Sequence, residues 1–222
     1  MKHYVNYSLL LLLGIVFSLS SKAQETTLVN GIYYEFNDET KTASVVWGEG
    51  YSGEINIPSI VNGYPVTSIG DYVFTGSPIT SVTIPNSVTS INHYAFGSCS
   101  ALTSVTIGSS VTEIGIGAFE YCTALTNVIC EAVNPPALGN EAFSDIPEEA
   151  TLYVPEGSVA AYSADEGWNL FKKILSLNEL PTSIEAVKTD TDNSAVYNLS
   201  GERMSKSGRG IFIKNGKKLI FK

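Results

Sequence analysis

A phenylalanine recurs at nearly constant spacing through the middle of the chain. Phe74, Phe96, Phe119 and Phe143 follow one another at intervals of 22, 23 and 24 residues. Each of the first three comes after a Val-Thr-x-Ile quadruplet, and the fourth comes after a degenerate Leu-Gly copy. A period in this range indicates a solenoid, in which each repeat buries its apolar face only against its neighbours. The repeat therefore predicts the fold, and it directs the search for function to an extended surface rather than a pocket.

Each repeat contains two strand-like pieces. The Val-Thr-x-Ile quadruplet is one of them, and the small residues around each Phe indicate a short helix or 3₁₀ turn after it. The other piece is an alternating run, and its copies lie at 54–58, 81–85, 104–108, 127–130 and 151–155. Alternation at period two places the flanking apolar residues inside and the central residue outside.

These repeats resemble those of the BspA-like leucine-rich repeat family. The resemblance covers about residues 50–175. Its motifs are Leu102-Thr103-Ser104-Val105-Thr106-Ile107, then Val111-Thr112-Glu113-Ile114-Gly115, and then Ala118-Phe119 with Cys122. The resemblance implies an α/β repeat solenoid, a right-handed leucine-rich repeat with a parallel β-sheet on one face. The family occurs on bacterial surface proteins.

A solenoid exposes apolar surface at both ends and needs caps there. Residues 24–50 hold two alternating runs around a polar turn, which predicts an N-terminal β-hairpin cap. The repeat domain with its C-terminal cap is placed at 51–176, and Ser158 is the expected N-cap of a short helix in that cap. We expect the large side chains that follow to form a lid on the last rung, and a binding patch of aromatic residues is the alternative. These side chains are Tyr162, Trp168, Phe171 and Ile174.

The first 23 residues have the pattern of a signal peptide. A polar start is followed by an apolar run at 9–17, and Ser21-Lys22-Ala23 supplies the small residues of a cleavage site. An uncleaved anchor is the alternative, but the apolar run is shorter than the roughly 20 residues that a membrane span needs. We expect an exported protein, either secreted or on the outer-membrane cell surface of a Gram-negative bacterium.

The end of the chain has a different composition. Residues 177–195 are polar and predict a linker, and residues 196–222 carry seven Lys or Arg against Glu202 alone. Three short strands are expected there, with turns at 200–201, 207–210 and 215–216. The segment resembles the C-terminal sorting domain of the type IX secretion system, through its Val-Tyr-Asn-Leu-x-Gly start, its Gly-Ile-x-Ile strand and its basic end. The resemblance implies export machinery as a partner; a β-hairpin packed beside the last rung is the alternative.

Charge in the repeat region has one sign. No Lys or Arg occurs between Lys41 and Lys172, whereas Asp and Glu occur 13 times there. Such a surface repels phosphates, which argues against nucleic acid as a partner.

The residues needed for catalysis are scarce. His93 is the only histidine after the signal segment, and the repeats align it with Asp71, Ile116 and Asn140. A position that accepts such different side chains is expected to be exposed and unconstrained, which argues against a catalytic base. With one histidine, neither a histidine-based metal cluster nor a Ser-His-Asp triad is assembled. We expect a non-catalytic protein without metal or cofactor.

The cysteines are interpreted as packing residues. Cys99 and Cys122 each follow a Phe by three residues, and Cys130 falls in the inward column of the alternating runs. Free cysteine behaves as a small buried hydrophobe. A disulfide between Cys99 and Cys122 is the alternative, because export permits it and it requires Cα atoms within about 7 Å.

The outward positions of the alternating runs form the candidate binding face. They are rich in hydroxyl groups and lack cations, and solenoids use such extended faces for binding. A simpler explanation for the threonines at these positions is that a β-branched side chain suits an exposed strand, whether or not a ligand binds there. An extracellular or host protein, such as a matrix protein, is the expected partner. A glycan stacked on Tyr153 is the alternative, and a hydrolase site between cap and tail is less favoured. The candidate residues are Asn56, Ser81, Thr83, Ser104, Thr106, Asn127, Ile129 and Tyr153.

Overall fold

The computed structural model divides the 222-residue chain into two compact units, residues 1–177 and 178–222. It describes residues 26–180 and the strands of the second unit. The predicted signal peptide and most of the predicted linker lie outside the described residues. Within the described residues, no helix combines the length and the apolar character that crossing a membrane requires.

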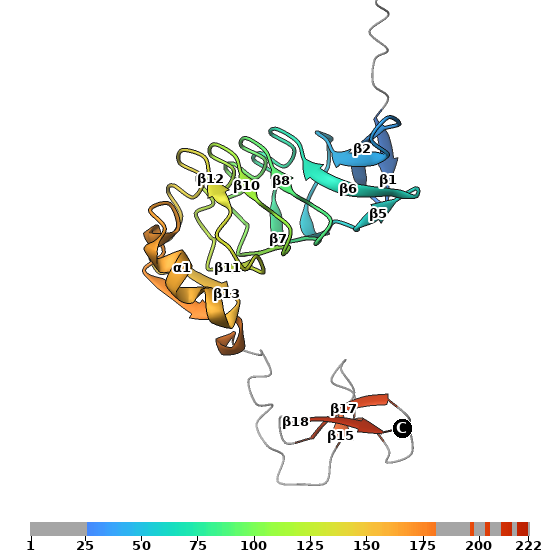
Figure 1. Cartoon of the computed structure of the whole chain (residues 1–222). Coiled ribbons are helices and arrows are strands. Elements are labelled where there is room, and N and C mark those ends of the chain that lie inside the picture. Colours follow the sequence, from blue (N-terminus) through green and yellow to red (C-terminus); the bar gives the residue numbers. More distant parts are fainter. Residues whose placement is uncertain (1–25, 181–195, 198–202, 205–209, 215–216, 222) are drawn as a thin grey trace, which may run out of the picture. The chain divides into compact units, whose positions relative to one another are not determined.

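The alternating runs form the first of two parallel ladders in the solenoid (Figure 1). One strand comes from each rung, a rung being one repeat of the solenoid, and all neighbouring strands of this six-stranded sheet run parallel. The strands, in spatial order, are β14 (Lys173–Ser176), β13 (Thr151–Val154), β11 (Asn127–Cys130), β9 (Ser104–Ile107), β7 (Ile79–Ile84) and β4 (Gly53–Asn56).

The Val-Thr-x-Ile quadruplets form a second parallel ladder, as the two-strand repeat predicts. Ile69, Ile91 and Ile114 lie in register on successive rungs, and each is buried. The solenoid thus has a sheet on two faces, whereas the family resemblance implied one. The strands of this eight-stranded sheet are β1 (Thr27–Val29), β2 (Ile32–Asn37), β3 (Thr42–Val45), β5 (Ile60–Val61), β6 (Tyr64–Ile69), β8 (Ser90–Ile91), β10 (Glu113–Ile114) and β12 (Ala137–Leu138).

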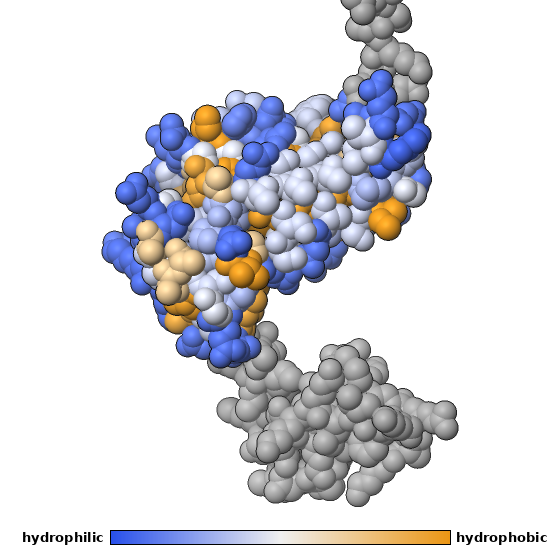
Figure 2. All heavy atoms as spheres, in the orientation of Figure 1, coloured by the Kyte–Doolittle hydropathy of each residue, from blue (hydrophilic) through white to orange (hydrophobic). Residues whose placement is uncertain are grey.

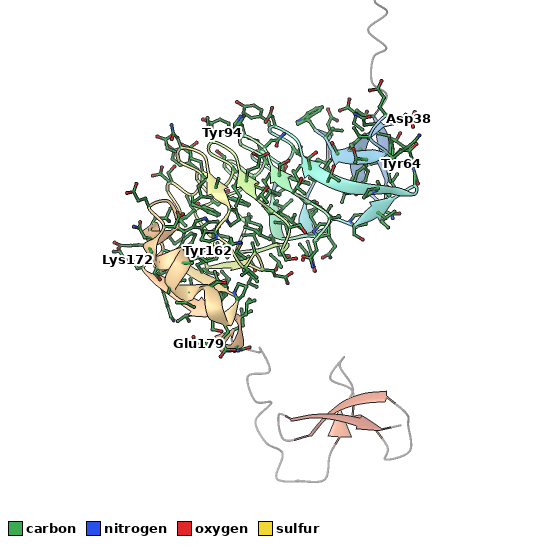
Figure 3. The ribbon with its side chains drawn as sticks, in the orientation of Figure 1. Asp38, Tyr64, Tyr94, Tyr162, Lys172 and Glu179 are labelled. Carbon is green, nitrogen blue, oxygen red and sulfur yellow. The ribbon has the colours of Figure 1, made fainter. Side chains whose placement is uncertain are left out.

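The N-terminal cap is the predicted hairpin with one additional strand. Strands β2 and β3 pair antiparallel, and the Asn37 side chain accepts hydrogen bonds from the backbone of Glu39 and Thr40 in the turn. The additional strand, β1, pairs antiparallel with β2. Tyr64 of β6 donates a hydrogen bond of 2.6 Å to Asp38 (Figure 3), which fastens the hairpin turn to the first rung.

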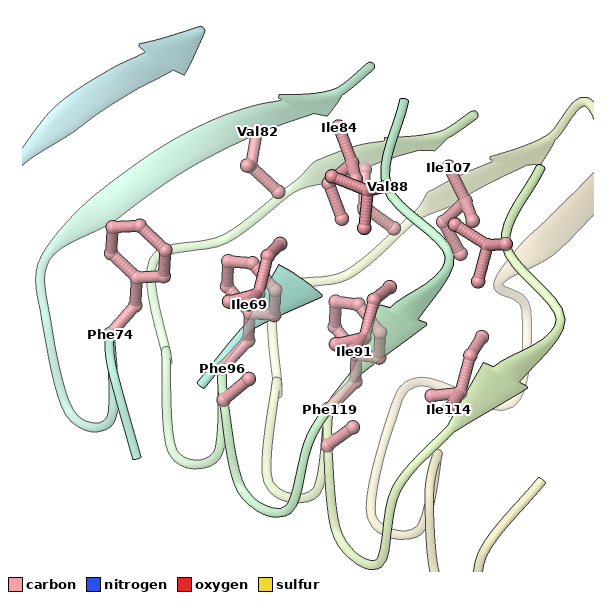
Figure 4. Close-up of a cluster of buried hydrophobic side chains, with 14 of the residues drawn as sticks. Ile69, Phe74, Val82, Ile84, Val88, Ile91, Phe96, Ile107, Ile114 and Phe119 are labelled. Atoms are coloured by element: carbon pink, nitrogen blue, oxygen red, sulfur yellow. The ribbon is translucent and has the colours of Figure 1, made fainter. Parts of the chain in front are cut away.

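A stack of phenylalanine rings runs through the core (Figure 4). The rings of Phe74, Phe96, Phe119 and Phe143 lie 5.0, 4.9 and 4.9 Å apart and within 9° of parallel. Tyr51 contacts the first ring at 4.6 Å, between ring centroids. Each Phe points inward, and the four rungs contribute one ring each to the same buried column.

The expected helix or 3₁₀ turn around each Phe is wrong. The backbone N–H groups of Phe74, Phe96 and Phe119 donate to carbonyls of the next rung, at 2.7 to 2.8 Å. These residues adopt turns rather than helix because alternate amides bond to the next rung, whereas the amides between them close i→i+3 turns within the rung, as Gly97 does with Tyr94. The residues two before and two after each Phe have positive φ, which reverses the chain direction.

The C-terminal cap is a lid of large side chains. It contains a 3₁₀ turn η2 (Glu156–Ser158), the helix α1 (Val159–Ala164), a 3₁₀ turn η3 (Trp168–Leu170) and a last turn η4 (Leu177–Glu179). Tyr162, Trp168 and Phe171 are buried, which confirms the lid. Ile174 belongs to strand β14, which the sequence analysis missed.

Ser158 is the N-cap residue of α1, as expected, but its side chain makes no capping hydrogen bond. Its hydroxyl donates instead to the carbonyl of Val133, 2.7 Å away, in the preceding rung. The Ser158 side chain therefore links the start of α1 to the preceding rung and does not cap the helix backbone.

The second unit contains a small antiparallel sheet of its own. It has four strands rather than three, in the spatial order β16-β15-β17-β18. The strand count differs because β15 and β16 are separate short strands. Most residues of the predicted turns lie outside the described part. The strands are β15 (Val196–Tyr197), β16 (Arg203–Met204), β17 (Gly210–Lys214) and β18 (Lys217–Phe221).

Candidate functional site

The predicted columns of the six-stranded sheet are present in the backbone register. Asn56, Thr83, Thr106, Ile129 and Tyr153 are successive partners across the ladder. The second column consists of Glu54, Ser81, Ser104, Asn127, Thr151 and Lys173. All the candidate residues therefore lie on one sheet, and we call their outward side the sheet face.

Exposure falls along the sheet face from β4 to β13. Asn56 and Thr83 are exposed, and Thr106 and Ile129 are half-buried, as are the candidates of the second column, Ser81, Ser104 and Asn127.

Tyr153 does not belong to an exposed face. Only 4% of its surface is accessible, and all four residues of β13 are buried. The last copy of the alternating run is at 151–155, but β14 pairs with β13 beyond it and places Leu175 beside Tyr153. The expectation of an exposed tyrosine at this end is wrong.

Threonine hydroxyls beside the sheet face have a structural use. Thr103 donates to the carbonyl of Thr80 at 2.9 Å, and Thr126 donates to that of Thr103 at 3.1 Å. In the described part of the chain, no hydrogen bond uses the hydroxyls of Thr83 or Thr106. These two hydroxyls remain available to a partner, whereas the flanking ones hold neighbouring rungs together.

The sheet face is neutral to negative from β4 to β13, and the exposed Lys173 of β14 adds a cation at its C-terminal edge. Glu54 accepts a 3.2 Å hydrogen bond from Asn56 at the N-terminal end. Lys172, in the C-terminal cap, pairs with Glu148 and thereby lowers the pKa of that carboxyl. Figure 2 shows weakly hydrophilic side chains over the middle of the solenoid and strongly hydrophilic ones along its rims.

His93 is exposed, as expected, but it is not unconstrained. Its Nδ1 accepts a hydrogen bond from the backbone N–H of Ile116 at 2.9 Å. Its own backbone N–H donates to the Asp71 carboxylate, also at 2.9 Å. Asp71 and His93 thus each accept a hydrogen bond from a backbone amide of the next rung. The sequence did not indicate this role, because the aligned side chains differ in type. The imidazole acceptor is occupied, which does not favour a general base.

The cysteines are free and buried, as the main interpretation predicted. Cys99 and Cys122 donate through Sγ to the carbonyls of Phe74 and Phe96, at 3.0 and 3.2 Å. Burial raises the pKa of both thiols to about 12, so both stay protonated. Within the described residues, no group of His, Cys, Asp and Glu is placed to hold a metal ion.

Two tyrosines outside the candidate list form a stacked pair on the turns. Tyr72 and Tyr94 each precede a core Phe by two residues, and their rings lie 5.2 Å apart and 10° from parallel. Sequence reasoning missed this pair, and the recurrence of Tyr two residues before successive Phe residues is the signal that could have found it.

The fold and its exposed face define a solenoid repeat protein. The family model described as the BspA type leucine rich repeat region matches residues 51–190 with 6 copies. The chain belongs to this family.

Solved structures agree with this assignment. A leucine-rich repeat protein from Bacteroides capillosus is 30% identical, with a TM-score of 0.50, over 58% of this chain and 97% of that one. One from Bacteroides ovatus is 29% identical, with a TM-score of 0.50, over 68% of this chain but 41% of its own. A Treponema pallidum leucine rich repeat protein, 20% identical with a TM-score of 0.50, shows likeness in fold alone. No curated protein matches the chain.

Proposed function

We propose that the protein is an exported, non-catalytic binding protein that presents the sheet face to an extracellular or host protein. The observation that carries this proposal is the register of the six-stranded sheet, which aligns polar side chains on successive rungs into one extended face. Solenoids bind partners through such faces. The free hydroxyls of Thr83 and Thr106 lie near its middle and supply hydrogen-bonding groups there.

Substitution of Thr83 and Thr106 by Lys tests the placement of the site. Two bulky cations at the centre of the sheet face are expected to weaken capture of purified extracellular-matrix proteins by about tenfold or more, as central interface changes do. The measurement is a pull-down quantified over a concentration series, with the unmodified chain as reference.

Thr89→Lys with Thr112→Lys is the matched control. Both threonines are exposed and lie one rung apart, but they immediately precede strands β8 and β10 of the other sheet, and their hydroxyls bond to the carbonyls of the preceding rung. This control pair is expected to retain capture. If the control pair reduces capture as strongly as the Thr83 and Thr106 pair, charge rather than position is responsible, and the sheet face is not the site.

Export and surface location are part of the proposal. The apolar run at 9–17 with its cleavage pattern supports removal of residues 1–23. The resemblance of residues 196–222 to a sorting domain supports a role of that segment in reaching the outer membrane. Mass spectrometry of the protein released by native cells is expected to show a start at Gln24 and an end near Pro181. Recovery of the chain through Lys222 would contradict removal of the segment during sorting.

The glycan alternative loses its main support in the structure. It depended on an exposed Tyr153 ring for stacking, and that ring is buried. A hydrolase has no supporting observation among the described residues, since the one histidine there is engaged with backbone. Protein binding remains the function that the geometry supports best.

A further inference from the structure

Two tyrosines occupy the same position of successive turns and stack on each other. The ring of Tyr72 lies 5.2 Å from that of Tyr94, and the rings are 10° from parallel. About half of Tyr72 is exposed, at 52%, and Tyr94 is half-buried. Tyr94 lies at the rim of the solenoid formed by the turns (Figure 3), away from the sheet face.

The backbone at this position does not favour tyrosine. Tyr72 and Tyr94 have φ of 58° and 52°, and Gly117 has φ of 58° at the equivalent position of the next rung. Glycine adopts this left-handed conformation without strain, whereas a side chain with a Cβ does not. Folding is therefore better served by glycine than by two exposed aromatic rings. Residues kept in strained conformations often serve binding.

Two carboxylates, those of Glu120 and Glu141, lie toward the Tyr94 end of the stacked pair. A Cβ placed on Gly117 would lie 3.0 Å from Oε2 of Glu120 and would collide with the Tyr94 ring, so both side chains converge above this glycine. Desolvation, followed by electrostatic interactions with Glu120, Tyr72 and Glu141 in that order, raises the pKa of the Tyr94 phenol. The phenol therefore stays protonated at neutral pH and can donate a hydrogen bond.

Among the described residues, no cation pairs with these carboxylates. The ion pairs among the described residues are Lys41 with Asp38 and Lys172 with Glu148. Neither Glu120 nor Glu141 takes part, and no Lys or Arg occurs between Lys41 and Lys172. An exposed surface that combines tyrosines with uncompensated negative charge is complementary to a positively charged partner.

We propose that Tyr72, Tyr94, Glu120 and Glu141, which we call the tyrosine ridge, bind a lysine- or arginine-rich protein surface. Exposed tyrosines are favoured in protein interfaces because each supplies a large, rigid contact with a polar tip. The two carboxylates supply the charge that pairs with Lys or Arg. The ridge also deepens the proposed function, because it adds a second surface and the chemistry of its partner.

A protein partner fits the ridge better than a glycan does. A sugar ring stacks on an open aromatic face, but the rings of Tyr72 and Tyr94 face each other, and that of Tyr94 also covers Gly117. About half of Tyr72 remains accessible, together with the exposed Glu141 and the half-buried Glu120. These groups suit the donors of Lys and Arg side chains.

The test is a titration of the full mature chain with a fluorescent Lys- and Arg-rich peptide, measured by fluorescence anisotropy. A peptide with Gln in place of each Lys and Arg is the ligand control. Tyr72→Asn with Tyr94→Asn removes both rings but keeps residues that tolerate positive φ. Glu120→Gln with Glu141→Gln removes the charges. Each pair is expected to raise the Kd by about tenfold, as central interface residues do.

Glu149→Gln with Glu166→Gln is the matched control. Both residues are exposed and belong to the C-terminal end of the solenoid, so the change in net charge is equal but lies elsewhere. This pair is expected to change the Kd by less than about twofold, as rim charges do. An equal loss from both glutamate pairs means diffuse attraction and overturns the proposal.

An unchanged Kd for the tyrosine pair also overturns it. So does a glycan-array signal that depends on Tyr72 and Tyr94 while the peptide does not bind. None of these outcomes bears on the sheet face, because capture of matrix proteins through Thr83 and Thr106 is measured separately.

Discussion

Replacing Phe119 by alanine is expected to lower the free energy of unfolding by about 3–5 kcal/mol. Its ring is fully buried and stacks on Phe96 and Phe143, each at 4.9 Å. Alanine would leave a cavity in the middle of the ring column, and the backbone there cannot collapse into it. The N–H of Phe119 donates to Ala142 of the next rung, which holds the turn in place.

Equilibrium denaturant unfolding of the mature chain, followed by circular dichroism, measures this change. Tyr121→Asn is the control, because Tyr121 lies in the same turn, is 51% exposed and has a positive φ that Asn tolerates. The control is expected to stay within about 0.5 kcal/mol of the unmodified chain. A loss below about 1 kcal/mol for Phe119→Ala would mean that the ring column is not a major part of the core.

Replacing Trp168 by alanine is expected to cost about as much, roughly 3–5 kcal/mol, because it opens the C-terminal end of the same column. Trp168 is fully buried, contacts Phe143 at 5.4 Å and Tyr162 at 5.2 Å between ring centroids, and donates from Nε1 to the carbonyl of Pro136 at 2.8 Å. Without it, the last rung loses its lid and the apolar end of the solenoid meets water.

Two further variants separate the parts of this effect. Trp168→Phe keeps most of the apolar volume but leaves the Pro136 carbonyl without its donor, which is expected to cost about 1–3 kcal/mol. Trp47→Ala removes the other tryptophan of the chain, which is 62% exposed, and is expected to change stability by less than about 0.5 kcal/mol. If Trp47→Ala destabilised the protein as much as Trp168→Ala, burial in the lid would not explain the effect.

Much of the fold could be predicted from particular residues. The recurring Phe, the Val-Thr-x-Ile quadruplet and the alternating runs each occupy one column, because parallel rungs place equivalent residues side by side. The hairpin at 32–45 followed from two alternating runs around Asn37. The lid was predicted from the large aromatic side chains near Trp168, because such side chains are expected to be buried rather than exposed in a polar segment.

The errors share one physical origin, which is contact between rungs. The turns around Phe96 were predicted as a short helix or 3₁₀ turn, but alternate amides there bond to the next rung. Ser158 and His93 were judged from their local sequence, yet both side chains satisfy backbone groups one rung away. Tyr153 was expected to be exposed because β14, which pairs with its strand, has no repeat signature.

The sequence by itself determined the period, the inward columns and the two ends of the solenoid, because a repeated apolar pattern has one way to be buried. Only the tertiary structure decided which outward residues are accessible. It removed Tyr153 from the sheet face and brought Tyr72, Tyr94, Glu120 and Glu141 together on the turns. The reason is that exposure depends on which rungs and caps lie beside a residue, and those neighbours are distant in the sequence.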